Sequence, residues 1–312
     1  MKLSTRALAL IAAAVTVLIW TSFIVIARAS AAHHLLSLDI AFLRIIGASC
    51  VLLPWGWWLT RSRHANAQTG SLLGLSPLPL RVTVLTGVFG SVLYAMLAYS
   101  GFFFAPAAHA SVLMPGSLPL WTSLLAVVLL HEHISRARAL GLACIVLGDM
   151  LVGGASLLKA FEGGEVWKGD VLFMCAAFCW SCYSVLVRRH ALDPVRTTIA
   201  ITAFACVSYV PIYAGAAYVG WVPSHLNSAP IAEMAFQAIY QGVGSVVISG
   251  ITFNVMIRHF GPVRSTMITA LVPGLSALGA VVFLNEPMSL NLLGGLALVT
   301  CGIVFGVRSP KH

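Results

Sequence analysis

The chain has 312 residues, of which 59% are hydrophobic and only 9% charged, whereas a soluble domain carries about 25% charged residues. So few charges cannot cover a water-exposed surface, and the composition excludes a soluble globular protein. The net charge of +9 comes from basic residues that stand singly or in pairs between apolar blocks. This pattern indicates membrane topology and not nucleic-acid binding. The seven cysteines all lie in apolar segments, so no disulfide framework is expected.

The apolar residues form blocks of about 20, the length that a helix needs to cross a hydrocarbon core about 30 Å thick. The first block follows two basic residues, as a signal peptide does, but it exceeds the roughly 7–15 residues of a signal core. We therefore expect it to remain as the first helix. Ten spans are predicted, at residues 7–27, 38–59, 82–103, 107–130, 138–157, 169–187, 197–219, 232–256, 264–284 and 289–307.

The basic residues between these spans are distributed unequally over the two sides of the membrane. With a cytoplasmic N-terminus, only Arg28, Lys159 and Lys168 lie outside, and nearly all the others lie inside. Because positive loops stay in the cytoplasm, the sequence predicts a multi-pass protein of the inner (plasma) membrane with both termini cytoplasmic.

An internal repeat divides the chain. Residues 20–28 recur as residues 180–188, a shift of 160. We predict two five-helix repeats, residues 1–158 and 159–312, in an all-α integral membrane protein with ten transmembrane helices. Because five is odd, the second repeat is inverted relative to the first, as in many secondary transporters. Further matches at a shift of 154 are Gly90 and Gly244, Pro119 and Pro273, Glu132 and Glu286, Gly141 and Gly295, and Gly148 and Gly302.

Aromatic residues are the first candidates for a substrate site. The repeat places Trp20 and Trp180 at equivalent points of two helices, and Tyr183 shares a helix face with Trp180. Large rings with a polar edge suit a pocket for an aromatic or amphipathic solute. Packing in the core or against lipid is the alternative. The third span adds Tyr94 and Tyr99 to this group.

Polar and proline residues extend the candidate site to other spans. Amides and hydroxyls in the eighth span indicate either a water-filled cavity or a hydrogen bond to a neighbouring helix. Prolines in the fourth span free backbone carbonyls, which predicts that this span lines the path; His109 there is either near its mouth or a plain interfacial residue. The predicted substrate-binding residues are Trp20, Tyr94, Tyr99, His109, Met114, Trp180, Tyr183, Gln241 and Ser245.

Charged residues near the spans receive structural interpretations. Glu132 and Glu286 occupy matching turns, three residues before Ser135 and Ser289, which are good helix N-caps. Carboxylates near helix N-termini are stabilised by the helix dipole, so we expect a structural role and not ion coupling.

Arg44 and Asp149 are the base and the acid that lie well inside spans. Their heights, calculated from the helix rise of 1.5 Å per residue, differ by only several Å. We therefore predict a buried ion pair. A proton carrier at Asp149, or an oligomer or lipid contact, is the alternative.

Several motifs together resemble the drug/metabolite transporter superfamily, in its ten-helix EamA-type branch. They are the helix-one Trp20, residues 42–44 (Phe-Leu-Arg), Pro119 leading to Glu132, and the equivalents Pro273 and residues 285–287 (Asn-Glu-Pro). Within that branch the chain is most similar to the aromatic amino-acid exporter group. The sequence has His131 and Asn285 where the family commonly has Gly, a departure that concerns the local turns and not the fold.

The resemblance implies a secondary transporter or exporter of aromatic or hydrophobic amino acids that works by alternating access in the lipid bilayer. Export of another metabolite or drug, or exchange of organic phosphates or nucleotide sugars, is the alternative substrate class. An intramembrane enzyme is disfavoured because residues 131–133 (His-Glu-His) lack the spacing of a zinc protease. No cofactor, metal or nucleic acid is expected, and both a monomer and a homo-oligomer are compatible with the sequence.

Overall fold

The computed structural model describes residues 5–62, 70–160, 164–269 and 271–307. Apart from one isolated bridge between Ser71 and Ser76, the described residues form helices and no strands. Nine of the described helical segments are long and apolar enough to span a membrane, and Leu290–Phe305 is a shorter apolar helix. The predicted all-α membrane fold is therefore confirmed.

The helices follow the predicted spans closely. The first half contains α1 (Thr5–Ser30), α2 (Ser37–Ser62), η1 (Leu72–Gly74), α3 (Leu80–Gly87), η2 (Val88–Val92), α4 (Leu93–Phe104), α5 (Ala107–Ser111), η3 (Val112–Gly116), α6 (Leu118–Leu130) and α7 (Arg136–Ala160). The second half contains α8 (Val166–Arg189), α9 (Pro194–Tyr218), α10 (Ile231–Gln237), η4 (Ala238–Ile248), α11 (Ser249–Phe260), α12 (Pro262–Ile268), α13 (Leu271–Leu284) and α14 (Leu290–Val307).

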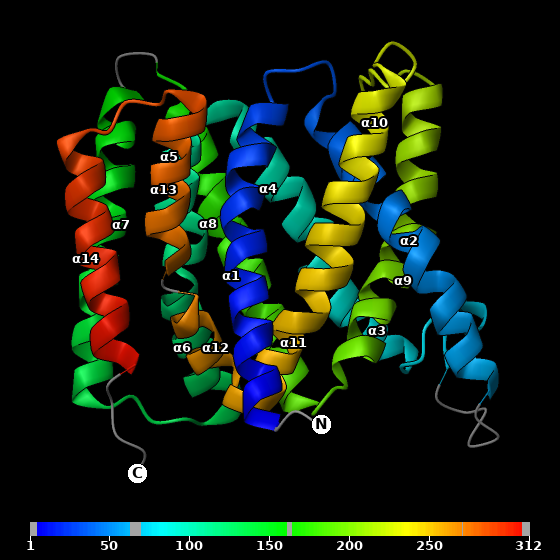
Figure 1. Ribbon diagram of the computed structural model, residues 1–312, viewed down its shortest axis with the longest axis horizontal. Coiled ribbons are helices and arrows are strands. Elements are labelled where there is room, and N and C mark those ends of the chain that lie inside the picture. The colour runs from blue at the N-terminus through cyan, green and yellow to red at the C-terminus, as the bar shows by residue number, and fades with distance from the viewer. Residues whose placement is uncertain (1–4, 63–69, 161–163, 270, 308–312) are drawn as a thin grey trace.

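The start of α1 and the end of α14 lie at the same end of the helical bundle (Figure 1). We call this end the terminal side and the opposite end the distal side. Turns 31–36, 219–230 and 285–289 lie on the distal side, and turns 131–135 and 190–193 on the terminal side (Figure 1). Successive spans therefore alternate in direction, as a polytopic membrane protein requires.

The two halves repeat their local geometry at the predicted turns. His131 and Asn285 both adopt left-handed backbone angles, with φ of 55° and 53°. The amide of the following glutamate then donates back to the helix, over 3.2 Å for Glu132 and 3.3 Å for Glu286. His131 and Asn285 thus adopt a left-handed backbone conformation that glycine would adopt with less strain.

The serines that follow these turns cap the next helices. Ser135 Oγ accepts from the backbone N–H of Arg138 at 3.3 Å, and Ser289 Oγ accepts from that of Leu292 at 3.1 Å. The predicted N-caps of the fifth and tenth spans are therefore confirmed.

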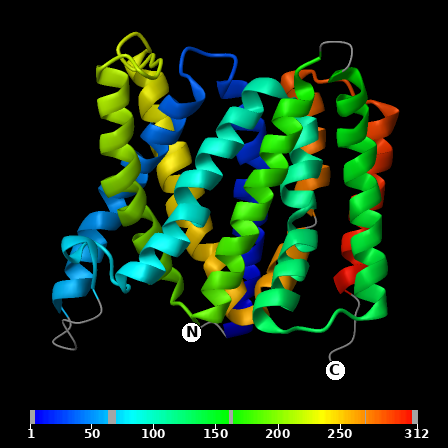
Figure 2. The ribbon, with the colours of Figure 1, turned by 180° about the vertical axis from the view of Figure 1, so that it is seen from behind.

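Helices α7 and α14 pack closely at one edge of the bundle, as both views show (Figures 1 and 2). A Cβ on Gly302 would lie 2.4 Å from the carbonyl oxygen of Gly141, and one on Gly148 would lie 2.7 Å from that of Gly295. Gly141 is the repeat equivalent of Gly295, and Gly148 is that of Gly302, so the two contacts are equivalent under the shift of 154. The pairing therefore has the two-fold symmetry that inverted halves require.

Three π-helical segments interrupt the spans. η2 contains Gly90 and η4 contains Gly244, which are equivalent positions, and η3 contains Pro115. Proline lacks the backbone N–H that a regular α-helix needs, and π segments recur at functional sites. Their occurrence in the third, fourth and eighth spans directs attention to the region where these spans meet.

The α7–α14 contact predicts different outcomes for two glycine substitutions. Gly302→Ala should destabilise the protein by about 1–3 kcal/mol, because overpacking forces the two backbones apart. Gly215→Ala, in α9, is the matched control, since nothing lies within 4 Å of its added Cβ, and it should be neutral or stabilise by up to about 1 kcal/mol. Thermal unfolding in detergent measures both, and equal unfolding temperatures would contradict this account of the contact.

Candidate functional site

An aromatic cluster lies where the two halves meet. The rings of Trp20 in α1 and Trp180 in α8 are 5.8 Å apart in an edge-on arrangement. Tyr94 in α4 lies 4.8 Å from Trp180, and Phe253 in α11 lies 4.8 Å from Trp20. The structure thus brings together three of the predicted residues. Phe253 was missed, although the repeat marks it as the equivalent of Tyr99 at a shift of 154.

A small cavity lies beside this cluster. Its walls include Trp20, Phe23, Tyr94, Met114, Pro115 and Trp180. Its volume is about 20 Å³, enough for about one water molecule. The predicted path-lining role of the fourth span agrees with the placement of Met114 and Pro115. An organic solute would need the walls to move apart before it could enter.

Arg44 lies next to this cavity and is only 6% exposed. Its Nη1 donates to the hydroxyl of Tyr99 at 3.1 Å and to Ser245 Oγ at 3.2 Å. Its Cζ lies 5.7 Å from the ring centre of Phe23 and 5.9 Å from that of Tyr94, two residues that line the cavity. Among the described residues no carboxylate pairs with it.

The predicted ion pair between Arg44 and Asp149 is wrong. Arg44 contacts neutral groups, and both carboxylate oxygens of Asp149 lack a hydrogen-bond partner among the described residues. Helix α2 packs against η4 and α9, whereas α7 packs mainly against α14. Similar heights along the helix axes did not bring the two residues together, because the helices lie apart laterally.

Two further predicted residues gather around Arg44. The Tyr99 hydroxyl donates to Gln241 Oε1 at 2.9 Å, and Ser245 lies one helical turn further along η4. Gln241 is fully buried, and its Nε2 has no acceptor among the described residues. The polar stripe of the eighth span therefore bonds to a neighbouring helix and also contacts the buried cation.

The last two predicted residues lie further from Arg44. The Tyr183 ring is 5.1 Å from Trp180, and its hydroxyl lies 3.0 Å from Asn254 Oδ1 and 2.7 Å from Asn254 Nδ2. His109 Nδ1 instead lies 2.9 Å from Asp170 Oδ1 on α8. The structure therefore joins Tyr183 to the aromatic cluster but does not bring His109 to the small cavity.

Glu286 connects three elements on the distal side. Its carboxylate accepts from the backbone N–H groups of Ala107 and Ala108, both at 3.0 Å, at the start of α5. It also accepts from Nε of Arg28 at 3.3 Å, and Arg28 Nη1 donates to the carbonyl of Phe102 at 2.6 Å. The helix N-terminus that this glutamate caps is that of α5, not of its own following helix α14.

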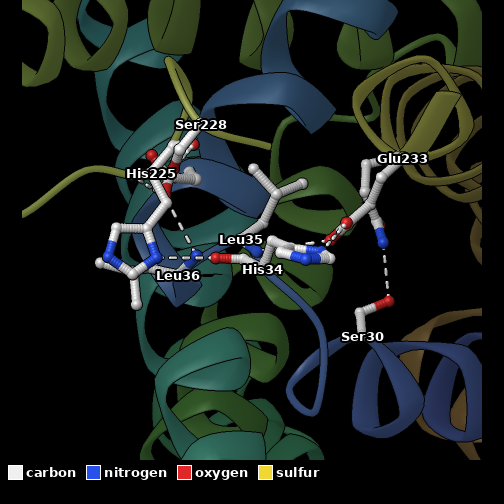
Figure 3. A network of polar contacts seen from close by, with 9 residues as sticks. Ser30, His34, Leu35, Leu36, His225, Ser228 and Glu233 are labelled. Atoms are coloured by element: carbon white, nitrogen blue, oxygen red, sulfur yellow. Dashed lines mark hydrogen bonds and ion pairs between the residues drawn. The ribbon is translucent and has the colours of Figure 1, made fainter. Parts of the chain in front are cut away.

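A second group of polar contacts joins two distal turns (Figure 3). His34 Nδ1 lies 3.0 Å from Glu233 Oε2, and the backbone N–H of Leu35 donates to Glu233 Oε1 at 3.3 Å. His225 Nδ1 lies 2.8 Å from the carbonyl oxygen of His34. The fully buried Asp39 accepts from the backbone N–H of His225 at 3.0 Å. Turns 31–36 and 219–230 are thereby held together.

Among the described residues, the terminal side lacks the equivalent of the Glu286 contact. The repeat pairs Glu286 with Glu132 and Arg28 with Arg188. The Glu132 side chain is 40% exposed and reaches Arg138 only at 3.9 Å, while Arg188 is exposed. The two ends of the bundle are therefore in different states although their sequences correspond.

Comparison with known proteins assigns the chain to a class. The sequence profile of the EamA-like transporter family matches residues 7–154 and 167–308. The chain therefore belongs to the EamA-like transporter family, and it is a multi-pass membrane transporter and not an enzyme.

Its relatives have low sequence identity but match most of the chain. The chain is 24% identical over 305 residues to an uncharacterized transporter of Archaeoglobus fulgidus, covering 96% of both chains. It is 23% identical over 237 residues to the transporter YyaM of Bacillus subtilis, covering 73% of this chain and 74% of that one. It is also 23% identical over 237 residues to a probable amino-acid metabolite efflux pump of Salmonella typhimurium, covering 72% and 75%. One solved crystal structure, 23% identical, shares the fold with a TM-score of 0.61 over 96% of both chains.

Proposed function

We propose that this transporter carries aromatic or hydrophobic amino acids by alternating access between its two halves. The observation that carries the proposal is Arg44, a buried cation with no carboxylate partner among the described residues, beside an aromatic cavity where the halves meet. A guanidinium binds a carboxylate through two parallel hydrogen bonds. A substrate carboxylate would therefore complete a site that the chain leaves without an anion.

The remaining parts of an amino acid also find partners of suitable chemistry. A large apolar side chain would contact the rings of Trp20 and Trp180 and the thioether of Met114 once the cavity expands. The α-ammonium group would lie against the face of Tyr94, since cations are attracted to aromatic rings. One of the distant relatives is named a probable amino-acid metabolite efflux pump, which agrees with this substrate class.

The alternative substrates fit the site less well. An organic phosphate would need two or more cations, because its charge exceeds that of a carboxylate. Among the described basic residues, only Arg44 contacts the rings around the cavity. A neutral drug or metabolite would make no use of the paired hydrogen bonds that the Arg44 guanidinium can donate to a carboxylate.

The two halves supply a mechanism for alternation. In this conformation Glu286, Arg28 and the start of α5 are in contact on the distal side, and we infer that this contact closes that side. We propose that the opposite conformation replaces it with Glu132, Arg188 and the start of α12. Closure at one side and release at the other would then be the same motion, because the repeats are inverted. The small cavity would expand as either contact opens.

We further propose that the protein lies in the plasma membrane with both termini in the cytoplasm. The distal side would then face outside. The charge bias of the loops supports this orientation.

The substrate proposal predicts a selective effect at Arg44. Arg44→Gln should lower the flux of labelled Phe into proteoliposomes at least tenfold, about 1.4 kcal/mol of lost carboxylate binding. In the wild type, 3-phenylpropanoate should compete with Phe better than 2-phenylethylamine does, and the variant should lose this preference. Arg61→Gln, at the exposed end of the same helix, is the control and should retain both properties. Wild-type Phe flux in Arg44→Gln would refute the carboxylate site.

The aromatic walls should matter in the same assay. Trp20→Ala and Trp180→Ala should each reduce Phe flux while the protein stays inserted. Trp221→Ala, whose side chain is 84% exposed, is the matched control and should be silent. Unchanged flux in both wall variants would show that the pocket has been misplaced.

Alternation predicts opposite behaviour for the two matching glutamates. Glu286→Gln should lower the unfolding free energy in detergent by about 1.5–3 kcal/mol, because it removes a charged acceptor. Glu132→Gln should change it by no more than about 0.5 kcal/mol, as surface substitutions do. Glu132→Gln should nevertheless slow Phe exchange several-fold, because it weakens the opposite conformation. Normal exchange in Glu132→Gln would show that its side chain has no part in the cycle.

The orientation can be tested by chemical labelling. Cysteines introduced in place of Leu73, on the terminal side, and Trp221, on the distal side, are both well exposed positions. In intact cells an impermeant maleimide should label the Trp221→Cys protein and leave the Leu73→Cys protein at the background of the wild type, whose cysteines lie in helices. The reverse pattern would place the termini outside.

A further inference from the structure

A second, larger cavity of about 380 Å³ lies between α6, α7 and α8. The fourth span separates it from the central cavity: Met114 and Pro115 line the central one, whereas Leu113 and Trp121 line the second. Ligand pockets in proteins usually measure about 300–1,000 Å³. The second cavity is therefore large enough for a small organic molecule without any movement of the walls.

Asp149 is the feature of this cavity that requires an explanation. It lines the cavity from the middle of α7, and only 7% of the residue is exposed. Neither carboxylate oxygen has a hydrogen-bond partner among the described residues, and no described base pairs with it. A buried carboxylate is stable only when a cation or hydrogen bonds compensate it. Arg44 is engaged elsewhere, so no described residue compensates this carboxylate, and a bound cation or a bound proton would do so.

The other walls favour a cation with an apolar body. Asp170 is a second buried acid in the lining, held at 2.9 Å from His109. Trp121 and Trp167 also line the cavity, and indole faces attract cations better than other rings do. Among the described residues, the lining contains no lysine, arginine or histidine. An anion would therefore be repelled, and a small hydrated metal ion would find too few oxygen ligands.

The mouth of the cavity faces the lipid. Met150 lines it and is 66% exposed, and its neighbour Leu147 is 56% exposed on the same helix. Large apolar side chains exposed in a membrane span contact lipid. Molecules that concentrate in the bilayer would therefore reach the cavity directly.

We propose that this cavity binds a lipophilic organic monocation, such as a hydrophobic ammonium, whose charge pairs with Asp149 and whose apolar part lies against Trp121 and Trp167. The site is separate from the central cavity and does not depend on the amino-acid function proposed above. Because α6 and η3 form walls of both cavities, occupancy of the second cavity would also restrain the span that lines the first.

Binding of radiolabelled benzyltrimethylammonium to the purified full-length protein in detergent tests the proposal. The wild type should bind it, and Asp149→Asn should bind at least tenfold more weakly. Glu165→Gln, which removes an acid whose side chain is 63% exposed, should bind like the wild type. Neopentylbenzene, the uncharged isostere of the probe, should not displace it. Asp149→Asn is expected to fold, since it removes an uncompensated buried acid, and thermal unfolding in detergent verifies this.

A second variant tests the cavity without changing charge. A Cβ on Gly154 meets nothing within 4 Å, so Gly154→Leu should fill the space and reduce binding at least tenfold. Absence of binding to the wild type, equal binding to Asp149→Asn, or displacement by neopentylbenzene would each overturn the proposal; the first result would indicate a protonated Asp149. Competitive displacement by Phe would place the cation in the central cavity and would also overturn the proposal of a second site. Loss of Phe transport in Arg44→Gln concerns the central cavity alone and would not bear on the second site.

Discussion

In a hydrocarbon core every backbone group and every charge must be compensated by the chain, because no water is available to do so. The described spans obey this rule along most of their length, with regular helices and charges confined to their ends. Irregular π segments occur where other helices surround them. The two departures are Arg44 and Asp149, each buried in a span without an ionic partner among the described residues. Each lies beside a cavity.

The signs of these two charges give the cavities opposite chemistry. Arg44 lies among aromatic rings at the junction of the inverted halves, where a transport path must run. Asp149 lies in α7, a helix at the edge of the bundle (Figure 2), beside the exposed Met150. Because the fourth span separates the two, they cannot neutralise each other. We therefore propose one site for an anion at the junction of the halves and one site for a cation away from it.

Much of the fold could be predicted from the sequence, because span length and the internal repeat act over long stretches. The repeat also singled out Trp20 and Trp180 as equivalent candidates, and the structure places their rings 5.8 Å apart. Equivalence alone does not require contact, because a two-fold axis relates residues at any distance from itself. Phe253 could have been added to the candidates as the equivalent of Tyr99. The repeat does not, however, show which helices touch within a half. The height argument for Arg44 and Asp149 failed for that reason, and the turn of His109 toward Asp170 was not foreseeable from helix spacing.

The asymmetry between the two ends of the bundle could not be predicted from the internal repeat either. Glu132 and Glu286 occupy matching turns, each after a residue in the left-handed conformation. Glu286 accepts from a helix N-terminus and from Arg28, whereas Glu132 only approaches Arg138 at 3.9 Å. A sequence describes both conformations of an inverted repeat at once, whereas a structure shows one. The difference between these corresponding turns is therefore the observation behind our proposal that the distal end is the closed one.

If Arg44 binds a substrate carboxylate, as we propose, its contacts also explain how the site could release that substrate. If a carboxylate of the chain held this guanidinium permanently, a substrate carboxylate would have to displace an ion pair made in low dielectric, where such pairs are strong. Instead, Tyr99, Ser245 and the aromatic rings hold it through neutral contacts. These contacts are weaker than a charged pair, so a substrate can replace them, and they reform when it leaves. The empty site therefore remains folded without an anion, which is what a transporter needs in order to return unloaded.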